Sequence, residues 1–322
     1  MSPLHTGDQL DHYRIEGVVA RSGMASIFRA EDLRTGQPVA IKVPHAEMES
    51  DPVLVERFHR EEEIGKKLEH PGVVRVLNEN SHSRPYIVME WAEGRLLRQV
   101  LNEQRKFTAE RATRIALGIC NTLEYIHRHG VIHRDLKPEN IMVDADDRIK
   151  LIDFGIASAG GARRITFTRL AGTMGTPDYI SPEQLDRKPG DARSDVYALG
   201  VMLYEMLTGT VPFTGPNPFA IMNDRLLNNP IPPREIDPKI SPQLQEIIYR
   251  ALERDPANRY ASAQEFACDL EHQDEISAAE RPELREWKRR GTPWPKKLLL
   301  YLGLLMIPVV IFSLLIYVAR HV

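Results

Sequence analysis

Short runs of β-branched and aromatic residues fill the first part of the chain, and turn residues separate them. Such runs are typical of strands. The segment 55–69 differs, because its apolar residues fall at helical spacing and the sequence His70-Pro71-Gly72 behind it stops a helix. The pattern therefore predicts one helix among five strands, at 13–20, 25–32, 38–43, 73–78 and 85–91.

In the second part of the chain the apolar residues recur at the spacing of helices. One predicted helix face carries Ile115, Ile119, Leu123 and Ile126, and Gly130 behind it is a ready C-terminal cap. The remaining expected elements are two short strands and a helical region, at 141–143, 148–152 and 194–274.

Together these patterns predict an α+β fold with a small β-rich lobe and a larger helical lobe. The larger lobe ends before a basic, proline-containing linker. The expected segments are an N-terminal tail, the small lobe, the large lobe and the linker, at 1–12, 13–93, 94–272 and 273–297.

An apolar segment follows the linker. Residues 298–318 carry no charge over 21 positions, which is enough helix to cross a hydrocarbon core of about 30 Å. A buried core helix is the alternative, but such helices rarely lack polar residues on every face. Basic residues are concentrated between 285 and 297, before the span. The positive-inside rule then predicts a single-pass protein of the inner cell membrane, with both lobes in the cytoplasm and a short outer tail at 319–322.

Charge and cysteine content narrow the function classes. The net charge is −3, so the chain lacks the positive excess that marks nucleic-acid-binding proteins, and no nucleic-acid partner is expected. The two cysteines, Cys120 and Cys268, are too few for a disulfide framework or a zinc site. They are expected to be inert thiols in a reducing compartment.

The strongest chemical signal is the run His133-Arg134-Asp135-Leu136-Lys137-Pro138-Glu139-Asn140. It precedes the predicted strand pair, and Asp153 follows that pair, so the hairpin brings the polar side chains to one end of a scaffold. Two carboxylates, an amide and an ammonium suit a divalent cation bound to phosphate oxygens. Asn140 and Asp153 are the expected metal ligands. Lys137 is expected to neutralise a transferring phosphoryl group, and Asp135 to accept the proton of an attacking hydroxyl.

This run, followed by Asp-Phe-Gly at 153–155, resembles the eukaryotic-like Ser/Thr protein kinases of bacteria. The resemblance covers about residues 13 to 270. It implies the bilobal protein-kinase fold, with ATP and Mg²⁺ as cofactors and Mn²⁺ as a substitute. In Val39-Ala40-Ile41-Lys42, it implies that Lys42 binds the α- and β-phosphates and pairs with Glu61. Glu61 falls on the inward face of its predicted helix, although it could also be one of three solvated acids at 61–63.

Other motif matches supply the adenine site and the substrate loop. Met89 resembles the residue that guards the adenine pocket, with Glu90 to Ala92 as the hinge. The segment 175–183 resembles the loop that docks a peptide substrate, and its Thr176, together with Lys137, is a Ser/Thr signature. The resemblance also implies three structural residues, a Glu–Arg pair and an aspartate that braces the catalytic loop, which fall on Glu183, Arg259 and Asp195.

The glycine-rich nucleotide loop departs from the family pattern. Its three glycine positions hold Ala20, Ser22 and Ala25, and only the extra Gly23 remains. Any of the three held at a positive φ would cost about 1 kcal/mol. If that cost arises only when the loop closes over nucleotide, it weakens ATP binding roughly fivefold to tenfold, so an active kinase with a high KM for ATP is expected. The expected loop residues around ATP are Val19, Ala20, Ser22, Gly23, Ala25 and Ile27.

These observations predict a membrane-tethered Ser/Thr protein kinase that acts on protein substrates and contacts the bilayer through 298–318. A tethered pseudokinase scaffold is the main rival, and a small-molecule kinase of related fold is a third interpretation that the peptide-docking loop disfavours. Autophosphorylation in trans, through a homodimer, is a further expectation. Thr166, Thr168 and Thr173 are its expected targets, with Arg134 as the partner of the phosphate.

Overall fold

The computed structural model describes residues 4–22, 25–46, 51–77, 83–153, 177–186 and 188–278, without the side chains of residues 53, 54, 57 and 177. These residues all belong to one compact unit, Met1–Ala279. No helix within these described ranges is long and apolar enough to cross a membrane. The expected membrane span at 298–318 lies outside them.

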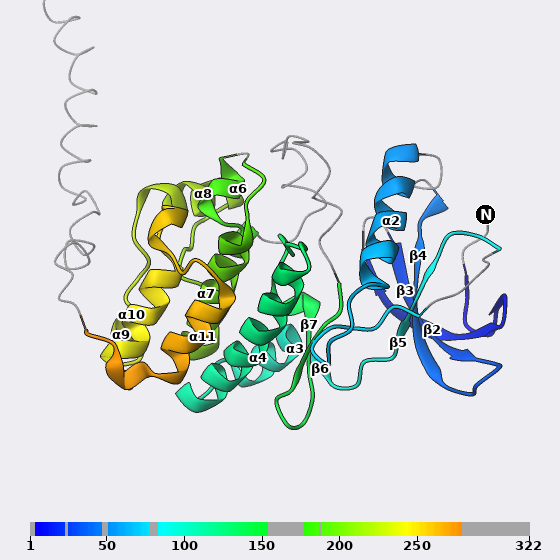
Figure 1. The fold of residues 1–322 in the computed structure, drawn as a ribbon, viewed down its shortest axis with the longest axis horizontal. Helices are drawn as coiled ribbons and strands as arrows, with labels where there is room; N and C mark the ends of the chain where they lie inside the picture. The colour runs from blue at the N-terminus through cyan, green and yellow to red at the C-terminus, as the bar shows by residue number, and fades with distance from the viewer. Residues whose placement is uncertain are drawn as a thin grey trace, which may run out of the picture. The chain divides into compact units, whose positions relative to one another are not determined.

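The small lobe is built on a five-stranded antiparallel sheet whose strands are neighbours in chain order (Figure 1). Alternate residues face one side of each strand, so Tyr13, Ile15, Phe28 and Ile41 become buried together. This sheet confirms the β-rich lobe that the sequence predicts. Its strands are β1 (Gln9–Leu10), β2 (Tyr13–Arg21), β3 (Ala25–Asp32), β4 (Pro38–Pro44) and β5 (Ile87–Glu90).

Helix α2 (Pro52–Gly65) covers one side of the small lobe. Its Phe58 packs among Val74, Val76, Ile87 and Met89. The predicted helix at 55–69 is therefore present, but it begins and ends earlier. Proline is well suited to the first helical position. At the other end, a Cβ on Gly65 would lie 2.4 Å from Val76 Cγ2, so glycine allows the helix end to approach Val76 closely.

The predicted strand at 73–78 is wrong as a continuous element, and its last residue lies outside the described ranges. Only two isolated bridges form here, Val73 with Leu151 and Val76 with Met89. The backbone of this segment has partners on both sides: the N–H of Val74 donates to Leu151 O, and that of Leu77 donates to Val88 O, each at 2.8 Å. Because these partners belong to different lobes, no single ladder can extend along the segment.

The large lobe is helical, as predicted, and surrounds the buried helix α7 (Ala192–Thr208). The apolar stripe of α4 (Ala109–Arg128) is fully buried, and Gly130 follows that helix at φ +74°. The other elements are the strands β6 (Arg95–Leu96), β7 (Ile141–Val143) and β8 (Ile149–Leu151), and the helices α3 (Leu97–Gln104), α6 (Pro182–Leu185), α8 (Pro218–Leu227), α9 (Pro233–Ile236), α10 (Pro242–Ala251) and α11 (Ala263–Glu271).

Two contacts define the junction between the lobes. Gly94 has φ +114°, and a Cβ there would lie 2.4 Å from Val143 O, so only glycine fits this crossing. Just before it, the Glu90 carboxylate accepts a hydrogen bond of 2.5 Å from Lys150 Nζ of β8. Gly94 therefore lies at a tight backbone crossing, and an ion pair supports the segment just before it.

Candidate functional site

Lys42 lies between two carboxylates that come from distant parts of the chain. Its Nζ donates to Glu61 Oε1 on α2 at 2.5 Å and to Asp153 Oδ1 after β8 at 3.0 Å. The side chains of Lys42 and Glu61 are only 14% and 13% exposed. The structure thus brings together three of the predicted site residues, and it excludes the alternative that Glu61 is a solvated surface acid.

Glu61 and Asp153 share the Lys42 ammonium, and the pKa values of these two carboxyl groups shift in opposite directions. Burial disfavours charge on Lys42, but the Asp153 and Glu61 carboxylates outweigh burial and raise its pKa. Burial would also raise the pKa of Asp153, yet Lys42 lowers it. Burial raises the pKa of Glu61 to about 7, against the opposing effect of Lys42 and with a contribution from the Asp153 carboxylate. Asp153 therefore holds the negative charge most firmly.

A second polar cluster lies on the loop before β7. Asp135 Oδ2 accepts a hydrogen bond of 2.6 Å from Lys137 Nζ. Asn140 Nδ2 donates to Asp135 O at 2.8 Å, and the short helix Pro138–Asn140 sets the position of that amide. The Asp135 side chain remains 46% exposed. A carboxylate held by an ammonium and open to solvent can accept a proton from an approaching hydroxyl.

The donor set fits a divalent cation. Because Asn140 directs its nitrogen to Asp135, its amide oxygen is left for another partner. Asp153 supplies a carboxylate whose pKa is lowered mainly by Lys42, against the effect of burial. The described residues contain no group of three or more His, Cys, Asp or Glu that could hold a metal by themselves. A cation bound by Asn140 and Asp153 would therefore take further oxygen ligands from phosphate and water.

Asp195 at the start of α7 braces the loop that carries Asp135. Its carboxylate accepts the backbone N–H of His133 at 2.9 Å and that of Arg134 at 2.8 Å. Arg134 has φ +63°, a conformation that costs free energy for a residue with a side chain. His127 Nε2 of α4 lies 2.8 Å from the same carboxylate. Asp195 thus holds the loop in the strained shape that presents Asp135.

The nucleotide loop is a tight hairpin between β2 and β3. Ser22 Oγ donates to Ala25 O at 3.0 Å and accepts the Ala25 N–H at 3.1 Å, while the Ser22 N–H also donates to Ala25 O at 2.9 Å. Ala20, Ser22 and Ala25 do not have positive φ. These three positions are therefore not strained in this conformation, and the strain expected when the loop closes over nucleotide stays a prediction. Gly23 lies outside the described residues.

The remaining predicted nucleotide residues lie on the strands beside this loop and at the hinge. Val19 on β2 is 53% exposed and Ile27 on β3 pairs with Lys42. Met89 is 7% exposed. The Glu90 carboxylate is turned toward Lys150, and its N–H donates to Arg75 O at 2.9 Å. At the hinge, the groups left to bind a ligand are therefore backbone groups, such as the Glu90 C=O and the backbone of Ala92, rather than the Glu90 side chain.

The predicted structural pair of the large lobe is present. Arg259 donates to both Glu183 oxygens, at 2.8 and 2.7 Å, and is itself fully buried. Burial would raise the pKa of Glu183, but Arg259 and Ser194 lower it. Because the arginine also donates to three backbone carbonyls, this pair holds α6 in place rather than facing a ligand.

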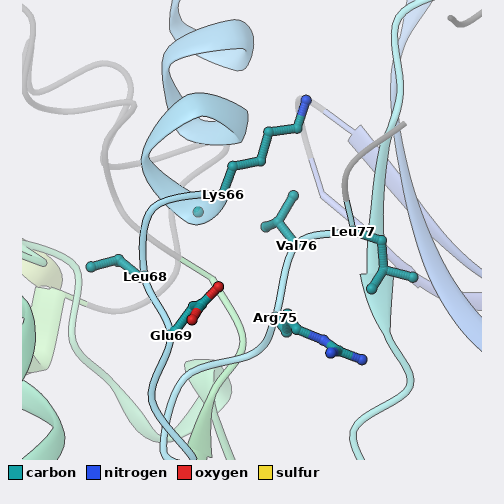
Figure 2. Close-up of a pocket in the computed structure, with 7 residues that line it drawn as sticks. Lys66, Leu68, Glu69, Arg75, Val76 and Leu77 are labelled. Carbon is teal, nitrogen blue, oxygen red and sulfur yellow. The ribbon is translucent and has the colours of Figure 1, made fainter. Parts of the chain in front are cut away.

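A separate hollow of about 250 Å³ lies at the end of α2 (Figure 2). It includes none of the predicted ATP or metal residues. The Lys66 ammonium extends away from Glu69 and Arg75 in Figure 2, and it pairs with Glu62 at 2.6 Å. Its lining residues are Gly65, Lys66, Leu68, Glu69, Arg75, Val76 and Leu77.

Sequence reasoning misses His127 and the cluster around Arg98. His127 follows Leu123 by four residues, so a histidine on the apolar stripe of α4 was the available signal. Arg98 Nε donates to Glu139 Oε1 at 2.8 Å, and its Nη1 donates to Glu205 Oε1 at 2.7 Å. Glu139 lies in the catalytic run, but Arg98 and Glu205 are far from it in sequence and belong to no motif, so the structure alone reveals this cluster.

Comparisons with known proteins agree with this arrangement. Residues 13–270 match the family model described as the protein kinase domain. The chain belongs to the protein kinase family. A probable serine/threonine-protein kinase of Streptomyces coelicolor is 41% identical over 80% of this kinase and 39% of its own length. The serine/threonine-protein kinase PknB of Mycobacterium tuberculosis is 38% identical over 84% of this kinase and 43% of its own length.

The solved structures give the same fold. A crystal structure of Rad53 in complex with AMP-PNP is 28% identical, with a TM-score of 0.65, over 80% of this kinase and 64% of that chain. The kinase spans less than half the length of the two curated relatives. The bilobal kinase fold and the bacterial Ser/Thr kinase relationship therefore follow directly.

Proposed function

We propose that this kinase transfers the γ-phosphoryl group of ATP to serine or threonine hydroxyls of protein substrates. The observation that carries the proposal is the position of Lys42, within 2.5 Å of Glu61 and 3.0 Å of Asp153. Glu61 holds the ammonium where phosphates can reach it, and Asp153 faces the same space with a cation-binding carboxylate. The names of the curated relatives support the Ser/Thr class.

Each residue then has a defined task. Lys42 binds phosphate oxygens, and Asn140 and Asp153 hold a divalent cation. Mg²⁺ suits these oxygen ligands, and Mn²⁺ can substitute for it. When bound, that cation neutralises charge on the phosphates. Asp135 orients the attacking hydroxyl and accepts its proton, while Lys137 supplies positive charge next to Asp135 at 2.6 Å.

The rival function is a scaffold that binds partners without catalysis. Its support is the replacement of glycine at positions 20, 22 and 25. A scaffold does not require Lys42, Glu61 and Asp153 to be in mutual contact, however, and it does not require Asp135 to be braced through Asp195. Catalysis explains both arrangements.

A transfer assay separates the two functions. The purified chain is incubated with labelled ATP, Mg²⁺ or Mn²⁺ and a library of neutral Ser- and Thr-containing peptides. Transfer by the wild type, lost in Asp135→Asn, is the expected result. ATP binding without transfer in the wild type would establish the scaffold instead.

We also propose that the loop before residue 177 is a site of autophosphorylation in trans. Arg134 has no ion pair with a carboxylate of the described residues, and its Nε is buried without a hydrogen-bond partner there. Such a guanidinium suits a phosphate. Thr166, Thr168 and Thr173 are the proposed acceptors, and they lie outside the described residues. Mass spectrometry after incubation with ATP tests this, and full activity in the triple Thr→Ala variant would exclude the switch.

Membrane attachment through 298–318 is a further proposal, supported by the uncharged run and the basic residues before it. Removal of residues 295–322 is expected to release a soluble, active kinase. Protease added outside intact cells is expected to leave the kinase domain intact. Digestion of that domain would show that the orientation is reversed.

A further inference from the structure

Arg98 binds to a cluster of Glu139, Glu205 and Tyr179 beside the proposed catalytic loop, and this cluster is called the acidic seat. Its Nε donates to Glu139 Oε1 at 2.8 Å, and its Nη1 donates to Glu205 Oε1 at 2.7 Å. Its Nη2 contacts the Tyr179 hydroxyl, which in turn donates to Glu205. Every nitrogen of the guanidinium therefore has an oxygen partner, which is the fork geometry that arginine recognition uses.

The seat has more negative charge than Arg98 can balance. Asp178, next to Tyr179, has a carboxylate oxygen that is buried without a hydrogen-bond partner among the described residues. Burial raises the pKa of Asp178, Arg225 opposes this, and the Glu205 carboxylate adds to it. Two carboxylates, those of Glu139 and Glu205, thus bind one arginine, so the seat would attract another cation if Arg98 were absent.

The position of the seat relates it to the substrate. Glu139 follows Asp135 by four residues, within the segment that also holds Lys137 and Asn140. Its side chain is 44% exposed, whereas that of Glu205 is 10% exposed, so the seat is open to solvent on the Glu139 side. A peptide with its hydroxyl at Asp135 would place nearby side chains at this opening.

The Arg259 pair provides a contrast within the same lobe. Arg259 is fully buried and donates to backbone carbonyls as well as to Glu183, which is what a purely structural arginine does. The Arg98 side chain is 24% exposed, and its partners among the described residues are side-chain oxygens. An arginine from another molecule could make the same contacts.

We infer that Arg98 is a specificity-determining residue: it occupies, from within the chain, an arginine-binding subsite next to Asp135 and so excludes basic substrate side chains from it. This inference rests on the proposed function, because it concerns the peptide that accepts the phosphoryl group. Removal of Arg98 converts the seat into an arginine-selective site. The wild type, in contrast, gains nothing from a basic residue at the position that faces the seat.

The peptide experiment uses a set of peptides in which one arginine is placed, in turn, at each position within five residues of the acceptor serine. For each variant, kcat/KM is divided by that for the matched alanine peptide, so loss of general activity cancels. Wild type is expected to give ratios near one, and Arg98→Ala a ratio of about ten or more at one position, since a hydrogen-bonded charge pair there is regained. The double variant Arg98→Ala/Glu205→Gln is expected to lose that preference.

Two controls keep the result interpretable. Arg95→Ala removes an arginine that pairs with Glu103 on the exposed side of α3, and it is expected to behave like the wild type. Arg98→Gln replaces the alanine variant if the latter does not fold. A wild type that already prefers arginine in a Glu205-dependent way, or an active Arg98→Ala variant with flat ratios, overturns the inference.

A binding experiment separates this inference from the proposed function. Low millimolar methylguanidinium is expected to raise the Tm of Arg98→Ala more than ethylammonium does, and to have no such effect on the wild type or the double variant. A Tm of Arg98→Ala that does not respond would show that no guanidinium seat exists. If no protein transfers phosphate to any peptide but this response is seen, the proposed function fails while the seat stands.

Discussion

His127 Nε2 lies 2.8 Å from Asp195 Oδ2, so the last turn of α4 contacts the same carboxylate that holds the catalytic loop. The other imidazole nitrogen is buried without a hydrogen-bond partner among the described residues. A neutral imidazole that donates through Nε2 fits this best, because a second N–H would be left unsatisfied. His127 therefore orients Asp195, which in turn holds Arg134 at its positive φ.

Replacement of His127 is expected to act on kcat. His127→Leu leaves Asp195 without one donor and relaxes the loop, so kcat is expected to fall about tenfold with little change in KM for ATP. His127→Gln keeps an N–H at a similar distance and is expected to recover most of that loss. Steady-state kinetics of both variants test the role. Equal losses of kcat and Tm in the two would point to packing alone.

The pH dependence of stability is expected to report on Glu61. Its pKa is raised from 4.5 to about 7, chiefly by burial. Between these values the folded chain retains a proton that the unfolded chain has released, so the free energy of unfolding falls as pH rises. The slope for one proton is at most about 1.4 kcal/mol per pH unit. The pKa of Asp153 is lowered and that of Lys42 is raised, so neither titrates in this window.

Urea unfolding between pH 5 and 7.5 measures this slope. Glu61→Gln is expected to flatten the profile, whereas Glu63→Gln, on the exposed face of α2, is expected to leave it unchanged. An identical profile in wild type and Glu61→Gln would assign the proton to another group.

Substitutions of Asp135 and of Asp153 are expected to impair different steps, phosphoryl transfer and ATP binding respectively. Asp135→Asn removes proton acceptance, so transfer is expected to fall by about 10² to 10⁴-fold while ATP affinity is retained. Asp153→Ala removes both a cation ligand and the partner of Lys42 at 3.0 Å, so it is expected to weaken ATP binding in the presence of Mg²⁺. Nucleotide titrations beside transfer rates separate the two effects. Wild-type turnover in either variant would contradict the assigned role.

The nucleotide loop is expected to gain nothing from glycine. Ala20, Ser22 and Ala25 are not at positive φ, so the combined glycine variant relieves no strain in this conformation. It loses the Ser22 hydroxyl contacts with Ala25 and weakens strands β2 and β3, at about 0.5–1 kcal/mol per position. A lower Tm and a KM for ATP that is not lowered are the expected results, with Ser22→Ala as the single-site comparison. A clear fall in KM at constant kcat would mean that the loop enters positive φ on binding ATP.

Local sequence signals are sufficient for most of this architecture. The period of two in the first strands and the stripe of α4 each follow from neighbours in sequence, and the catalytic run carries its own spacing. The segment at 73–78 is different, because its backbone N–H groups donate to Leu151 in one lobe and to Val88 in the other. No local sequence pattern contains that information. The same limit applies to Arg98, whose acceptors are 41 and 107 residues away.

During synthesis, the two carboxylate partners of Lys42 are made at different times. Glu61 is only 19 residues beyond Lys42, whereas Asp153 is 111 residues beyond it. All five strands of the small lobe precede residue 91 and pair in chain order, so this sheet can form while the rest is still being made. At typical elongation rates Asp153 emerges roughly 5 to 20 seconds after Lys42. During that interval the newly made lobe exposes the surface that the large lobe later covers, so translation speed and chaperone access are expected to influence the yield of folded protein.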